Sequence, residues 1–232
     1  YRDAKSDIYE ASLNRMGTLA SKIKSRFKKI LIFGIGGSYL GPKLMNDIFS
    51  SQDIEIDFIT GSDPTEYQNY IEQDLSDCAF IITSKSFFTI ETLTSYSAIT
   101  KGKLLDQTFA VTSAVNKAEA FGIDSNNIAQ VDLGTGGRFS IWSAVNLGLF
   151  ISLGRHGFEN FLSGAKSIDD LSSIDVNNNP ALSLAIQDLI MNNVLEMDST
   201  LILNYDYKLR NFSSYAQQLE MESLGKSIDR DT

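Results

Sequence analysis

The sequence has few of the residues that build disulfides or metal sites. Its 232 residues include one cysteine, Cys78, and one histidine, His156. A single cysteine allows neither a disulfide within the chain nor a zinc cluster, so a reducing, cytoplasmic setting is expected. His156 lies in the short stretch 154–157, which glycines flank, and there we expect an exposed structural residue in a turn between two helices.

Basic residues and long apolar runs are also scarce. Lys and Arg number 20 against 29 Asp and Glu, which gives a net charge of −9. No basic stripe suits nucleic acid or an anionic membrane surface, so neither is expected as a partner. No apolar run approaches the roughly 18 residues of a membrane span. The chain starts at Tyr1 and stops straight after a patterned segment, so we expect a piece of a longer protein.

The apolar runs that are present are short and alternate with helical patterns. Strands are predicted over residues 30–33, 54–60, 79–83, 108–112 and 128–131, and the first helix over 7–27. This alternation predicts an α/β fold with a doubly wound parallel sheet and helices on both faces. Later segments are predicted as helices over 140–153, 158–168, 180–197 and 212–225, and as a strand over 201–205. The best domain boundary lies between Ile168 and Pro180.

The first strand runs directly into a glycine-rich turn, GIGGSYLGP at residues 34–42. Gly37 allows a close approach of the backbone, and Ser38 lies where a helix would begin, so the turn suits a phosphate or another anion. Tight packing alone would explain the same glycines. A dinucleotide fingerprint requires Gly or Ala where Tyr39 stands, which argues against NAD.

A second turn, SKSFFTIET at residues 84–92, follows the third strand. Ser84, Ser86 and Thr89 bring three hydroxyls and Lys85 one ammonium to the start of a helix. These donors suit a phosphate, although a helix capped by serine or threonine with an exposed lysine would have the same sequence pattern. Ligands of such sheets collect at the carboxyl ends of the strands, so both turns could face one crevice.

Two further stretches carry charges that could take part in chemistry. Arg138 follows two glycines and could hold an anion or stabilise charge that develops in a reaction, or it could pair with a surface acid. Glu220 and Glu222 lie two apart on a predicted helix, so they point to different faces and only one can reach a given pocket. The residues alone do not choose between them as a general base.

Five separate motifs, taken in order, resemble the glucose-6-phosphate isomerase (phosphoglucose isomerase) family, which is built from sugar-isomerase (SIS) domains. They are GIGGSYLGP, SKSFFTIET, FGID, GGRFSIWSA and QQLEMESLGK. The resemblance implies a flavodoxin-like SIS domain with its N-terminal helix over 1–168 and the helical start of a second, truncated SIS domain over 169–232. It also implies an aldose-ketose isomerase of glycolysis and gluconeogenesis that is a cytoplasmic homodimer without metal or organic cofactor.

The resemblance also implies roles for single residues. Glu222 matches the base that moves a proton between C1 and C2 of the sugar, and Arg138 matches the arginine that stabilises the enediolate. The residues that match the family's phosphate-binding groups are Gly37, Ser38, Ser84, Lys85, Ser86, Thr89 and Gln218.

The sequence departs from the family in several places. Ser86 and Phe88 replace threonines, so one donor is lost at Phe88, and VDLGT at residues 131–135 replaces an aromatic-rich segment. The family's ring-opening histidine and a C-terminal lysine have no counterpart before Thr232, so this stretch alone is expected to be inactive. Two alternatives stay open: a non-catalytic SIS module that senses a sugar phosphate, and another SIS isomerase such as a phosphomannose isomerase.

Overall fold

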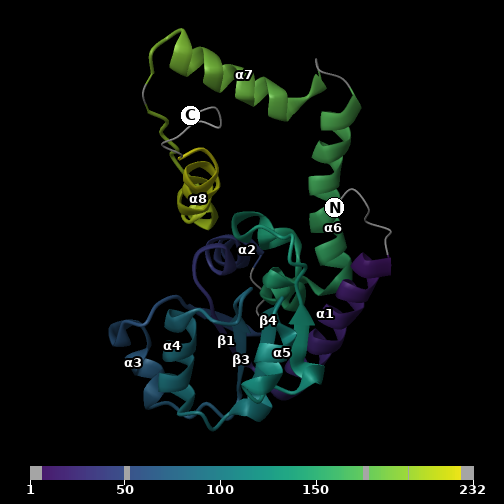
Figure 1. The fold of residues 1–232 in the computed structure, drawn as a ribbon, viewed down its shortest axis with the longest axis vertical. Coiled ribbons are helices and arrows are strands. Elements are labelled where there is room, and N and C mark those ends of the chain that lie inside the picture. Colours follow the sequence, from purple (N-terminus) through teal and green to yellow (C-terminus); the bar gives the residue numbers. More distant parts are fainter. Residues whose placement is uncertain (1–6, 50–52, 175–177, 198, 226–232) are drawn as a thin grey trace.

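Five short apolar runs form one parallel sheet (Figure 1). The structure is a computed structural model that describes residues 7–49, 53–174, 178–197 and 199–225. The strands are β1 (Lys29–Phe33), β2 (Glu55–Ile59), β3 (Cys78–Thr83), β4 (Thr108–Thr112) and β5 (Ile128–Gln130). Their order in the sheet is β2-β1-β3-β4-β5, and every neighbouring pair is parallel. The chain reverses its direction of winding between β1 and β3, which is the place where ligands bind in such sheets.

Helices cover both faces of this sheet. The helices that the structure describes are α1 (Asp7–Arg26), α2 (Leu40–Phe49), α3 (Pro64–Ile71), α4 (Ile90–Thr100), α5 (Val115–Ala120), α6 (Leu147–Ile174), α7 (Pro180–Asn193) and α8 (Phe212–Leu224), of which α7 does not cover the sheet. Alternate residues of a strand point to opposite faces. Ile30 and Ile32 of β1 therefore join a core with α1, α2 and α6, whereas Leu31 and Phe33 join a second core with α3, α4 and α5. The predicted α/β fold is confirmed.

The stretch before α6 differs from the predicted helix over 140–153. Residues Gly137–Trp142 and Ala144–Asn146 form two 3₁₀ turns, and α6 begins only at Leu147. Ser140 Oγ donates to the Gly137 carbonyl at 2.6 Å, and Ser143 Oγ accepts from the Val145 amide at 3.3 Å. Serine side chains that bond to the nearby main chain compete with the regular helix, and this is why the prediction was wrong here.

The predicted turn over 154–157 is a kink inside α6. Gly154 has φ 69° and ψ 177°, a conformation outside the helical region. His156 is exposed, as expected, but it lies on α6, with a ring nitrogen 3.4 Å from Asn160 Nδ2. The predicted domain boundary near Ile168 falls within α6 and stays a prediction.

The predicted strand over 201–205 is wrong. In the described part of the chain these residues pair with no strand, and Leu201 and Tyr205 are 78% and 92% exposed. An apolar run becomes a strand only where a neighbour offers its backbone groups. Among the residues that the structure describes, no helix is long and apolar enough to cross a membrane.

Candidate functional site

The two predicted turns meet at the carboxyl ends of β1 and β3. After β1, residues Gly36–Ser38 form a 3₁₀ turn in which Gly36 has φ 53°, a value that favours glycine. After β3, the Ser84 amide donates to the Val111 carbonyl at 3.1 Å, and the chain turns to reach Thr89, the residue that precedes α4. The Ser84 and Thr89 hydroxyls lie 2.9 Å apart and so face each other across this second turn.

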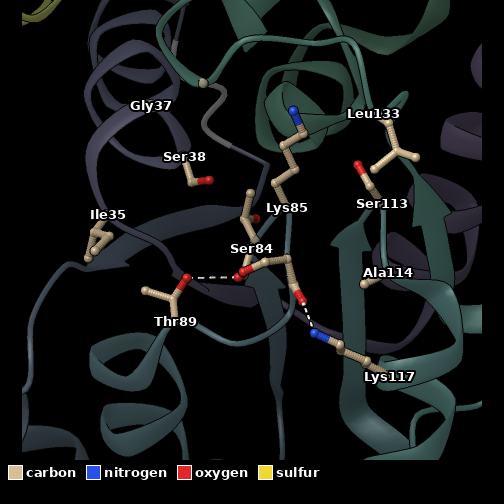
Figure 2. A pocket seen from close by; sticks show the side chains of 13 residues that line it. Ile35, Gly37, Ser38, Ser84, Lys85, Thr89, Ser113, Ala114, Lys117 and Leu133 are labelled. Carbon is tan, nitrogen blue, oxygen red and sulfur yellow. Dashed lines mark hydrogen bonds between the residues drawn. The ribbon is translucent and has the colours of Figure 1, made fainter. Parts of the chain in front are cut away.

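Both turns line one pocket of about 430 Å³ (Figure 2). Its lining residues are Ile35, Gly37, Ser38, Thr83, Ser84, Lys85, Ser86, Thr89, Ser113, Ala114, Lys117, Leu133 and Gly137. Six of the seven residues predicted to bind phosphate are therefore brought together. Among the described residues that line the pocket, none is acidic, so its hydroxyls and ammonium groups present a neutral-to-positive surface in a protein of net charge −9.

Lys85 and Lys117 supply the two positive charges of the pocket. Lys85 Nζ donates to the Thr135 carbonyl at 2.9 Å, so its side chain reaches toward the loop that leads to Arg138. Lys117 Nζ donates to the Ser86 carbonyl at 3.3 Å and lies 5.4 Å from the centre of the Phe88 ring. Both ammonium groups thus have main-chain partners and are held beside the serine-rich turn.

Ser113 and Lys117 also line the pocket but are not among the residues predicted from the sequence. Ser113 comes directly after β4, at the same edge of the sheet as Ser84, and its Oγ is buried without a hydrogen-bond partner. The rule that identified the other turns, polar residues at the carboxyl end of a strand, would also have identified Ser113. Lys117 gives no comparable signal, because only the folded sheet brings α5 beside the turn after β3.

Arg138 and Glu222 lie beside the pocket, not in its lining. Arg138 Nη1 is 3.3 Å from Glu222 Oε1, and Arg138 Nε donates to Ser223 Oγ at 2.8 Å. A Cβ added at Gly37 would lie 2.2 Å from the Gly137 carbonyl oxygen, so the two glycine turns are in direct backbone contact. This contact places the guanidinium and the carboxylate at the end of the pocket where Gly137 lies.

Gln218 approaches the first turn from α8. A Cβ added at Gly36 would lie 3.2 Å from Gln218 Nε2, and Gln218 Oε1 is buried without a partner. Gln218 is thus near the pocket but not among its lining residues. Glu220, the other candidate base, borders a separate hollow between α7 and α8, as expected for a residue on a different face of the helix.

No metal site is visible around these residues. In the ranges that the structure describes, no three His, Cys, Asp or Glu side chains are grouped so that they could hold a metal ion. The chemistry available at the site is therefore that of hydroxyls, two lysines, an amide, one guanidinium and one carboxylate.

The chain is similar to known proteins of one family. The family model described as phosphoglucose isomerase matches residues 10–232. A glucose-6-phosphate isomerase of Shewanella putrefaciens is 36% identical over 216 residues, which cover 87% of this chain and 40% of that protein. One from Christiangramia forsetii is 34% identical over 242 residues, covering 99% of this chain and 43% of the relative.

A solved structure supports the same assignment. The crystal structure of a glucose-6-phosphate isomerase from Chlamydia trachomatis matches this chain with a TM-score of 0.84 and 28% sequence identity. The match covers 96% of this chain and 45% of the Chlamydia chain. The chain thus spans less than half the length of the relatives it matches. Since the family model extends over almost the whole sequence, the chain belongs to the phosphoglucose isomerase family.

Proposed function

We propose that this chain forms part of an enzyme that interconverts glucose 6-phosphate and fructose 6-phosphate. The observation that carries the proposal is the meeting of two separate turns in one pocket beside the Arg138–Glu222 pair. A phosphate dianion requires several donors that converge from a small concavity. A proton transfer requires a base at a fixed distance from the bound phosphate, so that the reacting carbon lies beside the base. A module that only senses a sugar phosphate would not need the arginine and the glutamate.

The pocket would hold the phosphate end of the sugar. Hydroxyl donors, one ammonium and the backbone at the glycine turn would share its charge, and the Gln218 amide would reach it from α8. The proposed phosphate-binding residues are Gly37, Ser38, Ser84, Lys85, Ser86, Thr89 and Gln218. Hydrogen bonds to a charged group are the stronger kind, so several of them together give useful affinity.

Glu222 and Arg138 would carry the proton transfer. The Glu222 carboxylate accepts the proton from C2 of the open-chain aldose, and the electron pair of that C–H bond forms the C1–C2 double bond of an enediolate. The π electrons of the C1 carbonyl move onto O1 in the same step. The negative charge that develops on oxygen is stabilised by the guanidinium of Arg138. A proton then passes from the O2 hydroxyl to O1, and the electron pair left on O2 forms the C2 carbonyl. The electrons of the C1–C2 double bond take the proton back from Glu222 at C1, which gives the ketose and regenerates the base.

Membership of the family extends the proposal to the whole protein. We infer that the full-length protein is a cytoplasmic homodimer of glycolysis and gluconeogenesis that needs neither a metal nor an organic cofactor. We also infer that the ring-opening histidine lies outside the 232 residues, so these residues alone are inactive. Residues 1–168 would form one SIS domain and residues 169–232 the start of a second.

The role of the base is tested with Glu222→Gln in the full-length protein. Exchange of the C2 proton with deuterium oxide should fall by about 10²–10⁴-fold, the usual contribution of a general base, while sugar-phosphate binding is retained. Glu220→Gln is the matched control, since it removes a carboxylate from another face of the same helix. Normal turnover by Glu222→Gln would exclude Glu222 as the base.

The phosphate site is tested with the double substitution Ser84→Ala and Thr89→Ala. Each lost hydrogen bond to a charged group is worth about 1.5–3 kcal/mol, so KM should rise at least about tenfold. The kcat should change less, because neither hydroxyl touches the reacting carbons. Ser167→Ala on α6, whose hydroxyl donates to the Gly164 carbonyl, is the control. An unchanged KM in the double variant would remove the phosphate assignment.

A further inference from the structure

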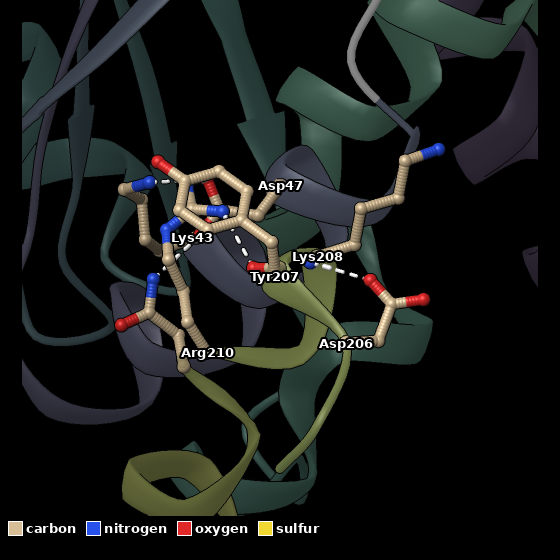
Figure 3. A network of polar contacts seen from close by, with 7 residues as sticks. Lys43, Asp47, Asp206, Tyr207, Lys208 and Arg210 are labelled. Carbon is tan, nitrogen blue, oxygen red and sulfur yellow. Dashed lines mark hydrogen bonds and ion pairs between the residues drawn. The ribbon is translucent and has the colours of Figure 1, made fainter.

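Asp47, near the end of α2, has a buried carboxylate that joins two distant parts of the chain (Figure 3). Its side chain is only 5% exposed. Oδ1 lies 2.5 Å from Lys43 Nζ and 2.5 Å from Arg210 Nη2, and Oδ2 accepts from Asn211 Nδ2 at 2.5 Å. Lys43 belongs to the same helix, whereas Arg210 and Asn211 follow more than 160 positions later and lead directly into α8.

Arg210 and Asn211, the two donors from the distant part of the chain, are positioned by their local contacts. Arg210 Nη1 donates to the Tyr207 carbonyl at 2.9 Å, and its guanidinium carbon lies 4.2 Å from the centre of the Tyr207 ring. Asn211 is the N-cap residue of α8, a position where an asparagine oxygen normally accepts from the helix main chain. Its side chain makes no such bond, and its amide donates to Asp47 instead.

The helices that meet at Asp47 are those that carry the site. The helix α2 begins beside the pocket, two residues after Ser38, and Asp47 lies near its other end. From there α8 leads back: Tyr215 packs on Gly41, Gln218 lies against Gly36, and Glu222 pairs with Arg138. The helices α2 and α8 therefore contact each other at Asp47, and their opposite ends both lie beside the pocket.

We propose that Asp47 is a positioning residue that, through Arg210 and Asn211, fixes the start of α8 on α2 and thereby sets the place of Gln218 and Glu222. The proposal rests on the proposed function of the site. Glu222 lies eleven positions after Asn211, which is about 16 Å of helix. A tilt of about 4° at the start of α8 thus moves Glu222 by about 1 Å, and a misplacement of that size can cost about 10²-fold in rate.

The experiment uses Asp47→Asn in the full-length protein, with steady-state kinetics and amide hydrogen exchange measured on the same sample. We expect kcat to fall at least tenfold and KM to rise by less than kcat falls, because only Gln218 is displaced together with Glu222, whereas the hydroxyls and Lys85 still bind the phosphate. Exchange over residues 212–224 should speed up, while the amides of β1 and β3 keep their protection. Asp170→Asn, which breaks an exposed ion pair with Lys166 on α6, should change neither measurement.

Arg210 gives a second and milder variant, since its side chain is 37% exposed. Arg210→Gln should lower kcat in the same way as Asp47→Asn, and Arg210→Lys, which keeps the charge, should retain more activity. The double variant Asp47→Asn with Arg210→Gln should be no slower than Asp47→Asn alone, because both changes break the same contact.

Three results would overturn the proposal: an unchanged kcat in Asp47→Asn, a rise in KM as large as the fall in kcat, or faster exchange throughout the sheet. The last would mean a general loss of stability. If the wild-type protein itself does not isomerise the sugar phosphate, the proposed function is wrong. The role of Asp47 is then tested by amide hydrogen exchange alone. Unchanged exchange over residues 212–224 in Asp47→Asn would then reject it.

Discussion

Asp57, in the middle of β2, is held by two donors from neighbouring elements. Lys29 Nζ lies 2.8 Å from Asp57 Oδ2, and the Tyr70 hydroxyl donates to the same oxygen at 2.6 Å. Partial burial alone would raise the pKa of Asp57, but the hydrogen bonds from Lys29 and Tyr70 outweigh it and lower this pKa below its usual range. Burial, and then the bond to Asp57, raise the pKa of Tyr70 to about 12, so the phenol stays a donor at neutral pH.

The lowered pKa of Asp57 makes part of the stability depend on pH. A carboxyl whose pKa is lower in the folded state stabilises the fold above its unfolded pKa of about 3.9, and this contribution is lost as the pH falls through the folded value. Asp57→Asn should therefore lower the free energy of unfolding by about 0.5–1 kcal/mol at pH 7, and by less at pH 3. Urea unfolding at both values measures this, with the exposed pair variant Asp170→Asn as control. An equal loss at both pH values would contradict the expectation.

Single residues of the candidate site differ in how well the sequence identifies them. Ser38 and Ser84 are recognisable because each lies in the turn that follows an apolar strand, and the structure brings both to one pocket. Lys117 could not be found in this way, since its place beside Ser86 depends on the order of β3 and β4 in the sheet. The binding and catalytic roles of the site residues stay predictions.

At the scale of elements, the two glycine turns of the site are in direct backbone contact. A Cβ at Gly37 would lie 2.2 Å from the Gly137 carbonyl oxygen, so Gly37→Ala must push apart the turns that carry Ser38 and Arg138. We expect a loss of about 1–3 kcal/mol in the free energy of unfolding, typical of overpacking, and a lower kcat. Urea unfolding and steady-state kinetics measure the two effects.

Gly164 on α6 is the matched control for this substitution. A Cβ there would meet nothing within 4 Å, and alanine is the better helix former, so Gly164→Ala should add about 0.5–1 kcal/mol of stability. If Gly37→Ala were as stable and as active as the wild type, the two turns would not be in the close contact that the structure describes.

The elements that the sequence predicts best are those with a local signal. Strands buried on both faces are short continuous apolar runs, and the predicted 108–112 coincides with β4. The failures depend on distant partners or on competing local bonds. Residues 201–205 have a strand composition but pair with no strand in the described chain. Ser140 and Ser143 turn a helical pattern into 3₁₀ turns.

At the scale of the whole molecule, apolar side chains are distributed unevenly. The sheet and its helices bury theirs in two cores, whereas α7 has no buried residue and stands away from the sheet (Figure 1). Leu184 and Leu189 of α7 are 63% and 59% exposed. Monomeric proteins rarely expose large contiguous apolar patches, so α7 offers an apolar surface on which molecules can associate.

The apolar surface of α7 should decide how the 232-residue chain behaves in solution. We expect it to bind the dye ANS and to scatter more light as its concentration rises, because apolar surface is removed from water when molecules associate. Leu184→Glu with Leu189→Glu should reduce both signals, since glutamate is a good helix former and leaves α7 intact. Ile8→Glu on α1 replaces a side chain that is 80% exposed but lies on another helix, so it should change neither signal. An equal reduction by both variants would mean that net charge, and not the surface of α7, controls association.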